Sequence, residues 1–105
     1  MTGDEKEDEV TQVVFRKFFN RYTRKWEVLA FLPGLPANPG NVMCYQHEGQ
    51  HGEASLDFYW HCRRCEQMEY EPLKREMEGI GYRFKIVKSI TKKMREEAWG
   101  WSKRK

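Results

Sequence analysis

Two stretches near the start of the chain, Thr11-Gln-Val-Val-Phe-Arg-Lys-Phe-Phe19 and Trp26-Glu-Val-Leu-Ala-Phe-Leu32, decide the fold. Both are rich in the β-branched and aromatic residues that favour the pleated, partly buried surface of a sheet. The polar segment 20–25 between them predicts a turn, so we expect two antiparallel strands. Apolar residues occupy both alternating sets of positions, and the pattern therefore does not fix which face of each strand is buried.

Two further elements follow these strands. Residues 33–40 combine prolines with glycines and predict a loop, and residues 41–47 predict a third strand. Residues 69–79 predict the clearest helix, because apolar residues recur at helical spacing. The stripe consists of Tyr70, Leu73, Met77 and Ile80. We expect it to pack on Val14, Leu29 and Phe31 or on their alternates.

The boundaries of the helix have local signals. Pro72 suits the first turn and Gly81 suits the C-terminal cap. Residues 82–90 alternate apolar and basic side chains and predict a strand with a basic outer face. Thr91 is expected to cap a short helix that continues to Trp99.

The remaining segments carry weaker patterns. Gly49 and Gly52 predict a loop after the third strand, and residues 53–68 fit either an irregular segment or a short helix. The element order is thus β-β-β-α-β. We expect an α+β fold, with a single four-stranded, mostly antiparallel sheet, one helix packed on a face and a short C-terminal helix.

Length and composition indicate one soluble domain. The chain has 105 residues, of which 33% are charged and 14% aromatic. We divide it into an acidic head, residues 1–9, a single domain, residues 10–99, and a basic tail, residues 100–105. No apolar run approaches the roughly 20 residues that span a bilayer. The acidic start is unlike a signal peptide, and three cysteines form an odd set, so we expect a reducing cytoplasmic location without disulfides.

All cysteines and histidines of the chain fall between residues 44 and 65. The pair Cys62-Arg-Arg-Cys65 has the spacing at which two thiolates share a tetrahedral zinc ion. The sequence therefore predicts, as one alternative, a structural zinc held by Cys62, Cys65, His47 and His51, with Cys44 as a substitute ligand. The competing interpretation has no cofactor: Cys44 is a small buried apolar residue and the pair is reduced.

The same window contains the string His47-Glu48-Gly49-Gln50-His51, which resembles the zinc-protease motif. That motif needs both histidines on one helical face, and glycine costs about 1 kcal/mol inside a helix. We therefore expect a glycine-containing loop rather than a protease site. The spacing of Cys62 and Cys65 also occurs in redox-active cysteine pairs, but these usually lie next to a βαβ unit, and no such pattern precedes Cys62 and Cys65. His47, His51 and Gln50 could instead contact a ligand or partner, since loops often carry binding residues.

Charge is unevenly distributed. Residues 1–9 carry five acidic and one basic residue, whereas residues 83–105 carry nine basic and two acidic residues. Such asymmetry is typical of a basic surface for an acidic partner, although solvated charged segments give the same pattern. The predicted partner- or nucleic-acid-binding residues are Arg16, Lys17, Arg21, Arg24, Lys25, Arg83, Lys85, Lys88, Trp99 and Trp101.

Four segments together resemble a small family of uncharacterised bacterial proteins found in phages and other mobile elements. They are Val13-Val-Phe-Arg-Lys-Phe, Val28-Leu-Ala-Phe-Leu-Pro, Cys44-Tyr-Gln-His-Glu-Gly-Gln-His-Gly and Leu73-Lys-Arg-Glu-Met-Glu-Gly-Ile-Gly-Tyr-Arg-Phe-Lys-Ile-Val-Lys. The resemblance covers about residues 12–90 and implies a shared fold and a mobile-element setting. The family pattern has an apolar residue where Glu48 stands and does not require the Cys62 and Cys65 pair.

These observations favour binding over catalysis. We expect a small non-enzymatic module that binds a host or phage protein, such as an inhibitor or modulator of a host defence factor. The alternatives are a nucleic-acid-binding protein that uses the basic face and a zinc-stabilised module, with a zinc hydrolase the least favoured. No membrane association is expected.

Overall fold

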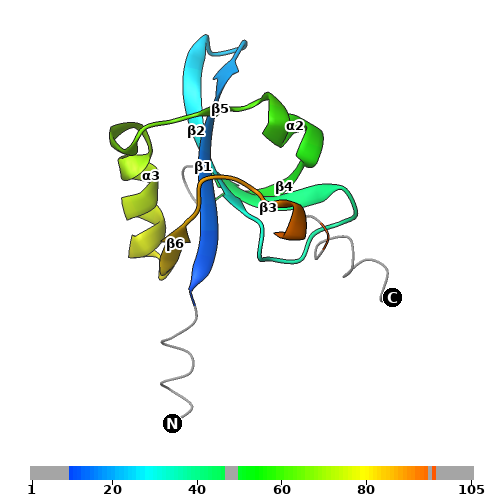
Figure 1. Cartoon of the computed structure of the whole chain (residues 1–105). Coiled ribbons are helices and arrows are strands. Elements are labelled where there is room, and N and C mark those ends of the chain that lie inside the picture. The colour runs from blue at the N-terminus through cyan, green and yellow to red at the C-terminus, as the bar shows by residue number, and fades with distance from the viewer. Residues whose placement is uncertain (1–9, 47–49, 95, 97–105) are drawn as a thin grey trace.

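A six-stranded sheet forms the centre of the protein in a computed structural model that describes residues 10–46, 50–94 and 96. The strand order is β4-β3-β2-β1-β5, and β6 pairs separately with β1. The strands are β1 (Thr11–Asn20), β2 (Lys25–Leu32), β3 (Asn41–Gln46), β4 (Gln50–Ser55), β5 (Arg63–Arg64) and β6 (Phe84–Ile86). The helices named here are α2 (Leu56–His61) and α3 (Gln67–Gly79). The long strand β1 runs through the middle of the molecule (Figure 1).

The two stretches that decide the fold form the β1–β2 hairpin, as predicted. Their antiparallel register runs from Val14 opposite Phe31 to Asn20 opposite Lys25. The side chain of Asn20 accepts hydrogen bonds from two backbone N–H groups of the turn. Arg24 closes this turn with φ 61°, a left-handed conformation that a non-glycine residue rarely adopts. The hydrogen bonds that the Asn20 side chain accepts thus help to hold the turn in this shape.

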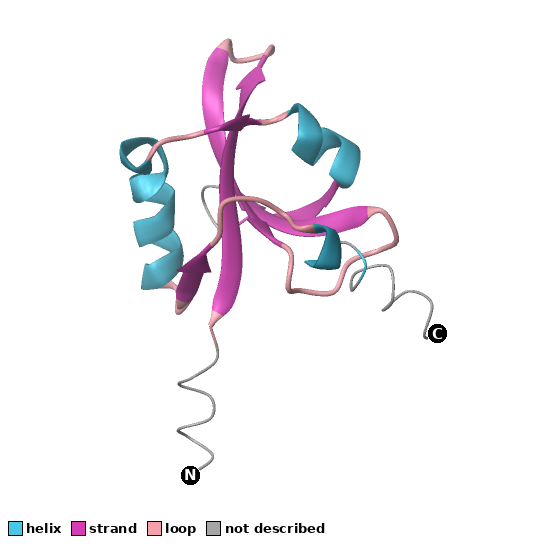
Figure 2. Ribbon diagram, viewed as in Figure 1, coloured by secondary structure: helices cyan, strands magenta, loops and turns pink. Residues whose placement is uncertain are grey.

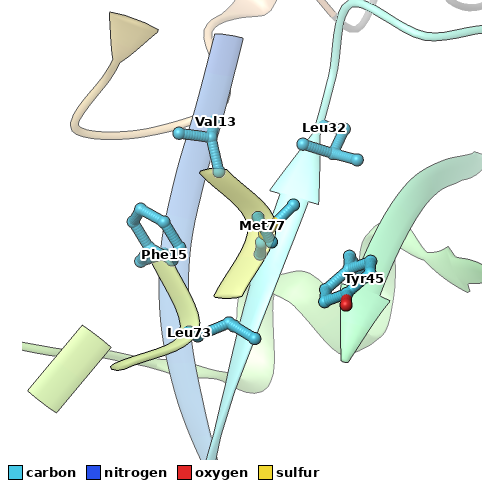
Figure 3. Close-up of a cluster of buried hydrophobic side chains, with 7 residues drawn as sticks. Val13, Phe15, Leu32, Tyr45, Leu73 and Met77 are labelled. Atoms are coloured by element: carbon cyan, nitrogen blue, oxygen red, sulfur yellow. The ribbon is translucent and has the colours of Figure 1, made fainter. Parts of the chain in front are cut away.

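Both faces of the sheet are covered, which explains why apolar residues occupy both sets of strand positions. Figure 2 shows α3 on one side of β1 and α2 on the other. The cluster under α3 contains Val13, Phe15, Ala30, Leu32, Tyr45, Leu73 and Met77 (Figure 3). The cluster under α2 contains Val14, Leu29, Phe31, Val42, Tyr59 and Ile90. The α3 stripe therefore packs on Val13, Ala30 and Leu32, which alternate along the strands with the predicted Val14, Leu29 and Phe31.

The structure corrects the number and extent of the strands while keeping the predicted α+β class. The sheet has six strands rather than four. Gly52 does not lie in a loop, because β4 passes through it and pairs it with Cys44. The last predicted strand, 82–90, is reduced to β6, and β6 runs parallel to β1. The length of a strand and the choice of its partner depend on tertiary packing, which the local alternation of residues does not encode.

The helix boundaries also differ from the prediction. A capping box, in which Glu66 and Glu69 exchange side-chain and backbone hydrogen bonds, starts α3 at Gln67. Pro72 therefore lies inside the helix rather than in its first turn. Leu73 and Met77 are buried as predicted, but Ile80 is 57% exposed because the helix has already ended at Gly79.

The structure shows helical residues in both of the segments 53–68 and 91–96. Ser55 caps α2 by accepting from the Phe58 N–H, so this region contains a short helix. Thr91 accepts a hydrogen bond from the Met94 N–H, as expected of a helix cap, and residues 92–94 and 96 are helical. The acidic head, His47, Trp99, Trp101 and the basic tail lie outside the described residues. Within those residues, each helix is too short or too polar to cross a membrane.

The two methionines of α3 provide a matched test of this packing. Met77 is fully buried, whereas Met68 is 79% exposed. We predict that Met77→Ala lowers the free energy of unfolding by about 2–5 kcal/mol, because it leaves a cavity between α3 and the sheet. Met68→Ala should change it by less than about 0.5 kcal/mol. Urea unfolding followed by circular dichroism measures both, and equal effects would contradict the placement of α3.

Candidate functional site

The far end of the β1–β2 hairpin gathers exposed aromatic and basic side chains. We call this surface the hairpin end; its members are Phe19, Arg21, Tyr22, Arg24, Lys25 and Trp26. Residues 18–20 and 25–27 pair only with each other, while β3 and β5 pair further along the hairpin. The hairpin end therefore projects beyond the neighbouring strands, as Figure 1 shows.

Two aromatic side chains of the hairpin end, Phe19 and Trp26, are held in defined positions. Phe19 and Trp26 are cross-strand partners, and their rings meet edge to face with centroids 5.6 Å apart. The ammonium group of Lys17 lies 5.2 Å from the Trp26 ring and also pairs with Glu69 of α3 at 2.6 Å. Trp26 remains 50% exposed and Tyr22 is 99% exposed. The surface thus presents two rings held by neighbouring side chains, Phe19 and Trp26, beside the almost fully exposed ring of Tyr22.

Only part of the predicted basic set lies together. Arg21, Arg24 and Lys25 are exposed on the hairpin end. Residues 83, 85 and 88 are also exposed, but they lie on or beside β6, which pairs with the opposite end of β1. The structure therefore separates the predicted cations into two surfaces.

Arg16, predicted as a contact residue, is 8% exposed and lies in the interior. It alternates with Val14 and Phe18 on the face of β1 that α2 covers. Its guanidinium donates to the carbonyl oxygens of Phe15 and Lys88 and to the hydroxyl of Tyr59. It also lies 5.3 Å from the centre of the Tyr59 ring. Arg16 is therefore unavailable to the flat surface of a large partner.

Two exposed cations were missed in the sequence analysis. Arg63 and Arg64 form β5 and pair with Lys17 and Arg16 of β1. The Cys62-Arg-Arg-Cys65 segment drew attention only through its cysteines. Two consecutive arginines could have indicated an exposed basic pair. Their position beside β1, however, depends on the tertiary fold, which the local sequence does not show.

The candidate zinc ligands in the described part of the chain lie on different sides of the sheet. Cys44 and Cys62 pack against the cluster under α2, whereas Cys65 packs against the cluster under α3. His51 lies in β4, where its Nε2 shares a 2.7 Å hydrogen bond with the Tyr82 hydroxyl. Among described residues, no three His, Cys, Asp or Glu side chains form a metal-binding group. His47 lies outside this set, so the zinc site stays a prediction.

The same arrangement bears on the chemistry of the thiols. Burial raises the pKa of Cys62 and of Cys65 to about 11, and it also raises the pKa of Cys44. The charge of Arg16 acts on both Cys62 and Cys65 in the opposite direction but does not offset burial. At neutral pH these thiols are protonated, which is the unreactive form of cysteine.

Alkylation tests this thiol environment. We predict that Cys62 and Cys65 react with iodoacetamide at least tenfold more slowly at pH 8 in the folded protein than in denaturant, because only the thiolate reacts. Between pH 9 and 10 the folded rate should keep rising by about tenfold, while the denatured rate levels off. Peptide mass spectrometry gives the rate at each cysteine. Rates equal to those of the denatured chain would contradict the raised pKa values.

Metal analysis belongs beside this measurement, because bound zinc would also slow the reaction. We expect slow reaction to persist after dialysis against a chelator. One zinc per chain, with rapid reaction of both cysteines once it is removed, would instead establish the site predicted from the sequence.

Tyr59 supplies a second test. Its hydroxyl accepts from the Arg16 guanidinium and from the Ile90 N–H at 2.9 Å, and both donors are buried. Tyr59→Phe should lower the free energy of unfolding by about 1–3 kcal/mol, because it leaves buried donors unpaired. Tyr22→Phe is the matched control and should have almost no effect. A neutral Tyr59→Phe variant in urea unfolding would show that the network contributes little.

Comparison with protein-family models, with curated proteins and with solved structures finds no match to this chain. The resemblance to mobile-element proteins therefore stays a prediction.

Proposed function

We propose that this protein is a non-catalytic module that binds another protein through the hairpin end. The observation that carries the proposal is a projecting hairpin whose tip combines exposed aromatic rings with cations. The hairpin end contains three exposed basic residues, Arg21, Arg24 and Lys25, and no acidic residue. Tryptophan, tyrosine and arginine are the residues that contribute most to protein–protein affinity, so an acidic protein surface is the fitting partner.

The shape of this surface favours a protein partner over nucleic acid. A projecting tip fits into a concave site, where a buried aromatic anchor is most effective. Single-stranded nucleic acid usually lies along a basic groove and stacks its bases on open ring faces. Here Phe19 packs edge to face on Trp26, and Lys17 lies near the same indole. Tyr22 is the most exposed aromatic residue of the hairpin end.

The setting of the partner rests on the resemblance alone. If the chain shares the mobile-element setting of the proteins it resembles, the expected partner is a host protein, such as a defence factor that the module inhibits or modulates. Nucleic acid is the alternative partner of the same cations, because lysine and arginine contact phosphates without regard to sequence.

Site-specific photo-crosslinking tests the proposal. A benzophenone amino acid in place of Tyr22 should yield a discrete protein adduct in host cells, and the same group in place of Ile80 should not, although both positions are exposed. Trp26→Ala should then weaken binding of the identified protein by at least tenfold, as expected for an interface anchor. Isothermal titration calorimetry measures this loss.

Charge variants separate the two classes of partner. Arg21→Glu with Arg24→Glu should abolish capture, while Lys85→Glu, an exposed cation of β6, should preserve it. Capture that nuclease removes, with a steep dependence on salt, would identify nucleic acid as the partner. Capture that depends on Lys85 but not on the hairpin end would overturn the proposal.

A further inference from the structure

A cavity opens where two strands part along the outer edge of β1. β5 pairs with β1 at Arg16 and Lys17, and β6 pairs with β1 from Thr11 to Val13. Between these pairings β1 lacks a continuous neighbour among the described residues, and β5 and β6 lie at different heights along it (Figure 1). A cavity of about 400 Å³ lies there. We call it the edge cavity; it is lined by Phe15, Arg16, Arg64, Cys65, Tyr70, Ile86, Val87 and Lys88.

The edge cavity has three basic lining residues and no acidic one. Arg16 is the most unusual, because its buried guanidinium donates only to neutral oxygens in the described structure. The carboxylate of Glu69, whose charge acts on Cys65, is already paired with Lys17 at 2.6 Å. A buried cation without a counter-ion is costly. An anion in the edge cavity would offset that cost.

The guanidinium also has donors left for a ligand. Arginine carries five N–H donors, and Arg16 uses three in the hydrogen bonds to Phe15, Tyr59 and Lys88. Arg64 and Lys88 are exposed residues at the mouth. Together the three residues can supply a charge of about +3, which suits a doubly charged phosphate better than a single carboxylate.

The rest of the lining is apolar. Phe15 and Tyr70 stack with centroids 4.3 Å apart and planes within 5° of parallel. Ile86 and Val87 line the cavity with them, and the raised pKa keeps the Cys65 thiol neutral. The volume lies within the range of small-molecule sites, which combine an apolar lining with a few polar groups.

We propose that the edge cavity binds a small organic phosphate, with the phosphate near Arg16, Arg64 and Lys88 and the organic body against the apolar lining. This site is separate from the hairpin end, and the proposal does not depend on the partner proposed above. Its ligand is recognised by charge and size, so a nucleoside monophosphate is a suitable probe.

Calorimetry with adenosine monophosphate and with inorganic phosphate tests the site on the full chain. We expect one saturable site per chain for the nucleotide, with at least tenfold weaker binding of inorganic phosphate, which lacks the organic body. Arg64→Gln and Lys88→Gln should each weaken nucleotide binding by at least tenfold. Lys85→Gln removes the same charge from β6 outside the lining and should change it by less than twofold.

Three results would overturn the proposal. The first is that neither probe shows saturable binding. The second is equal affinity for the two probes, and the third is an equal loss of nucleotide affinity in Lys85→Gln and Arg64→Gln. The variants act on exposed side chains, so folding is expected to survive, and circular dichroism of each variant verifies it. Arg16→Gln is reserved as a second variant because its side chain also joins three elements of the fold.

Discussion

One buried guanidinium joins three parts of the chain. Arg16 lies on β1, Tyr59 on α2 and Lys88 beyond β6, and two hydrogen bonds of Arg16 connect all three. Tyr59 then accepts from the Ile90 N–H and so fixes the segment that follows. Because the partners are neutral oxygens, they satisfy three donors of Arg16 but not its charge. Arg16 therefore helps to hold α2 and residues 88–90 against β1, and it supplies one of the three positive charges of the edge cavity.

The arrangement is a consequence of building a two-sided core from a short, polar chain. A sheet with one solvated face would leave half of the apolar strand residues exposed. Here α3 covers one face, while α2 and the segment after β6 cover the other. A charged residue on the face of β1 that α2 covers then has no direct route to solvent, and Arg16 is buried there. Arg16 instead extends along the outer edge of β1, where β5 and β6 leave room.

Helices and strands with a periodic pattern of apolar residues could be predicted from the sequence. Strands and sites that depend on contacts between distant segments could not. The β1–β2 hairpin, β3 and α3 follow from local alternation and helical spacing. β4 contains Gly52 and β5 has only two residues, so neither carries a strand pattern. The cations of the hairpin end are neighbours in sequence and could be named together. The edge cavity combines residues 15–16, 64–65, 70 and 86–88, which only the tertiary fold brings together.

We propose binding rather than turnover, and the chemistry of the described thiols and cations supports that proposal. A catalytic cysteine needs a lowered pKa or a base beside it, whereas burial raises the pKa of Cys62 and Cys65. The Nε2 atom of His51 shares a hydrogen bond with the Tyr82 hydroxyl, and the imidazole packs edge to face on Tyr45. The cations, by contrast, lie where they can meet another molecule: some on a projecting tip and some around a cavity. Because these two basic surfaces have different shapes, we propose a macromolecule as the partner of one and a small anion as the ligand of the other.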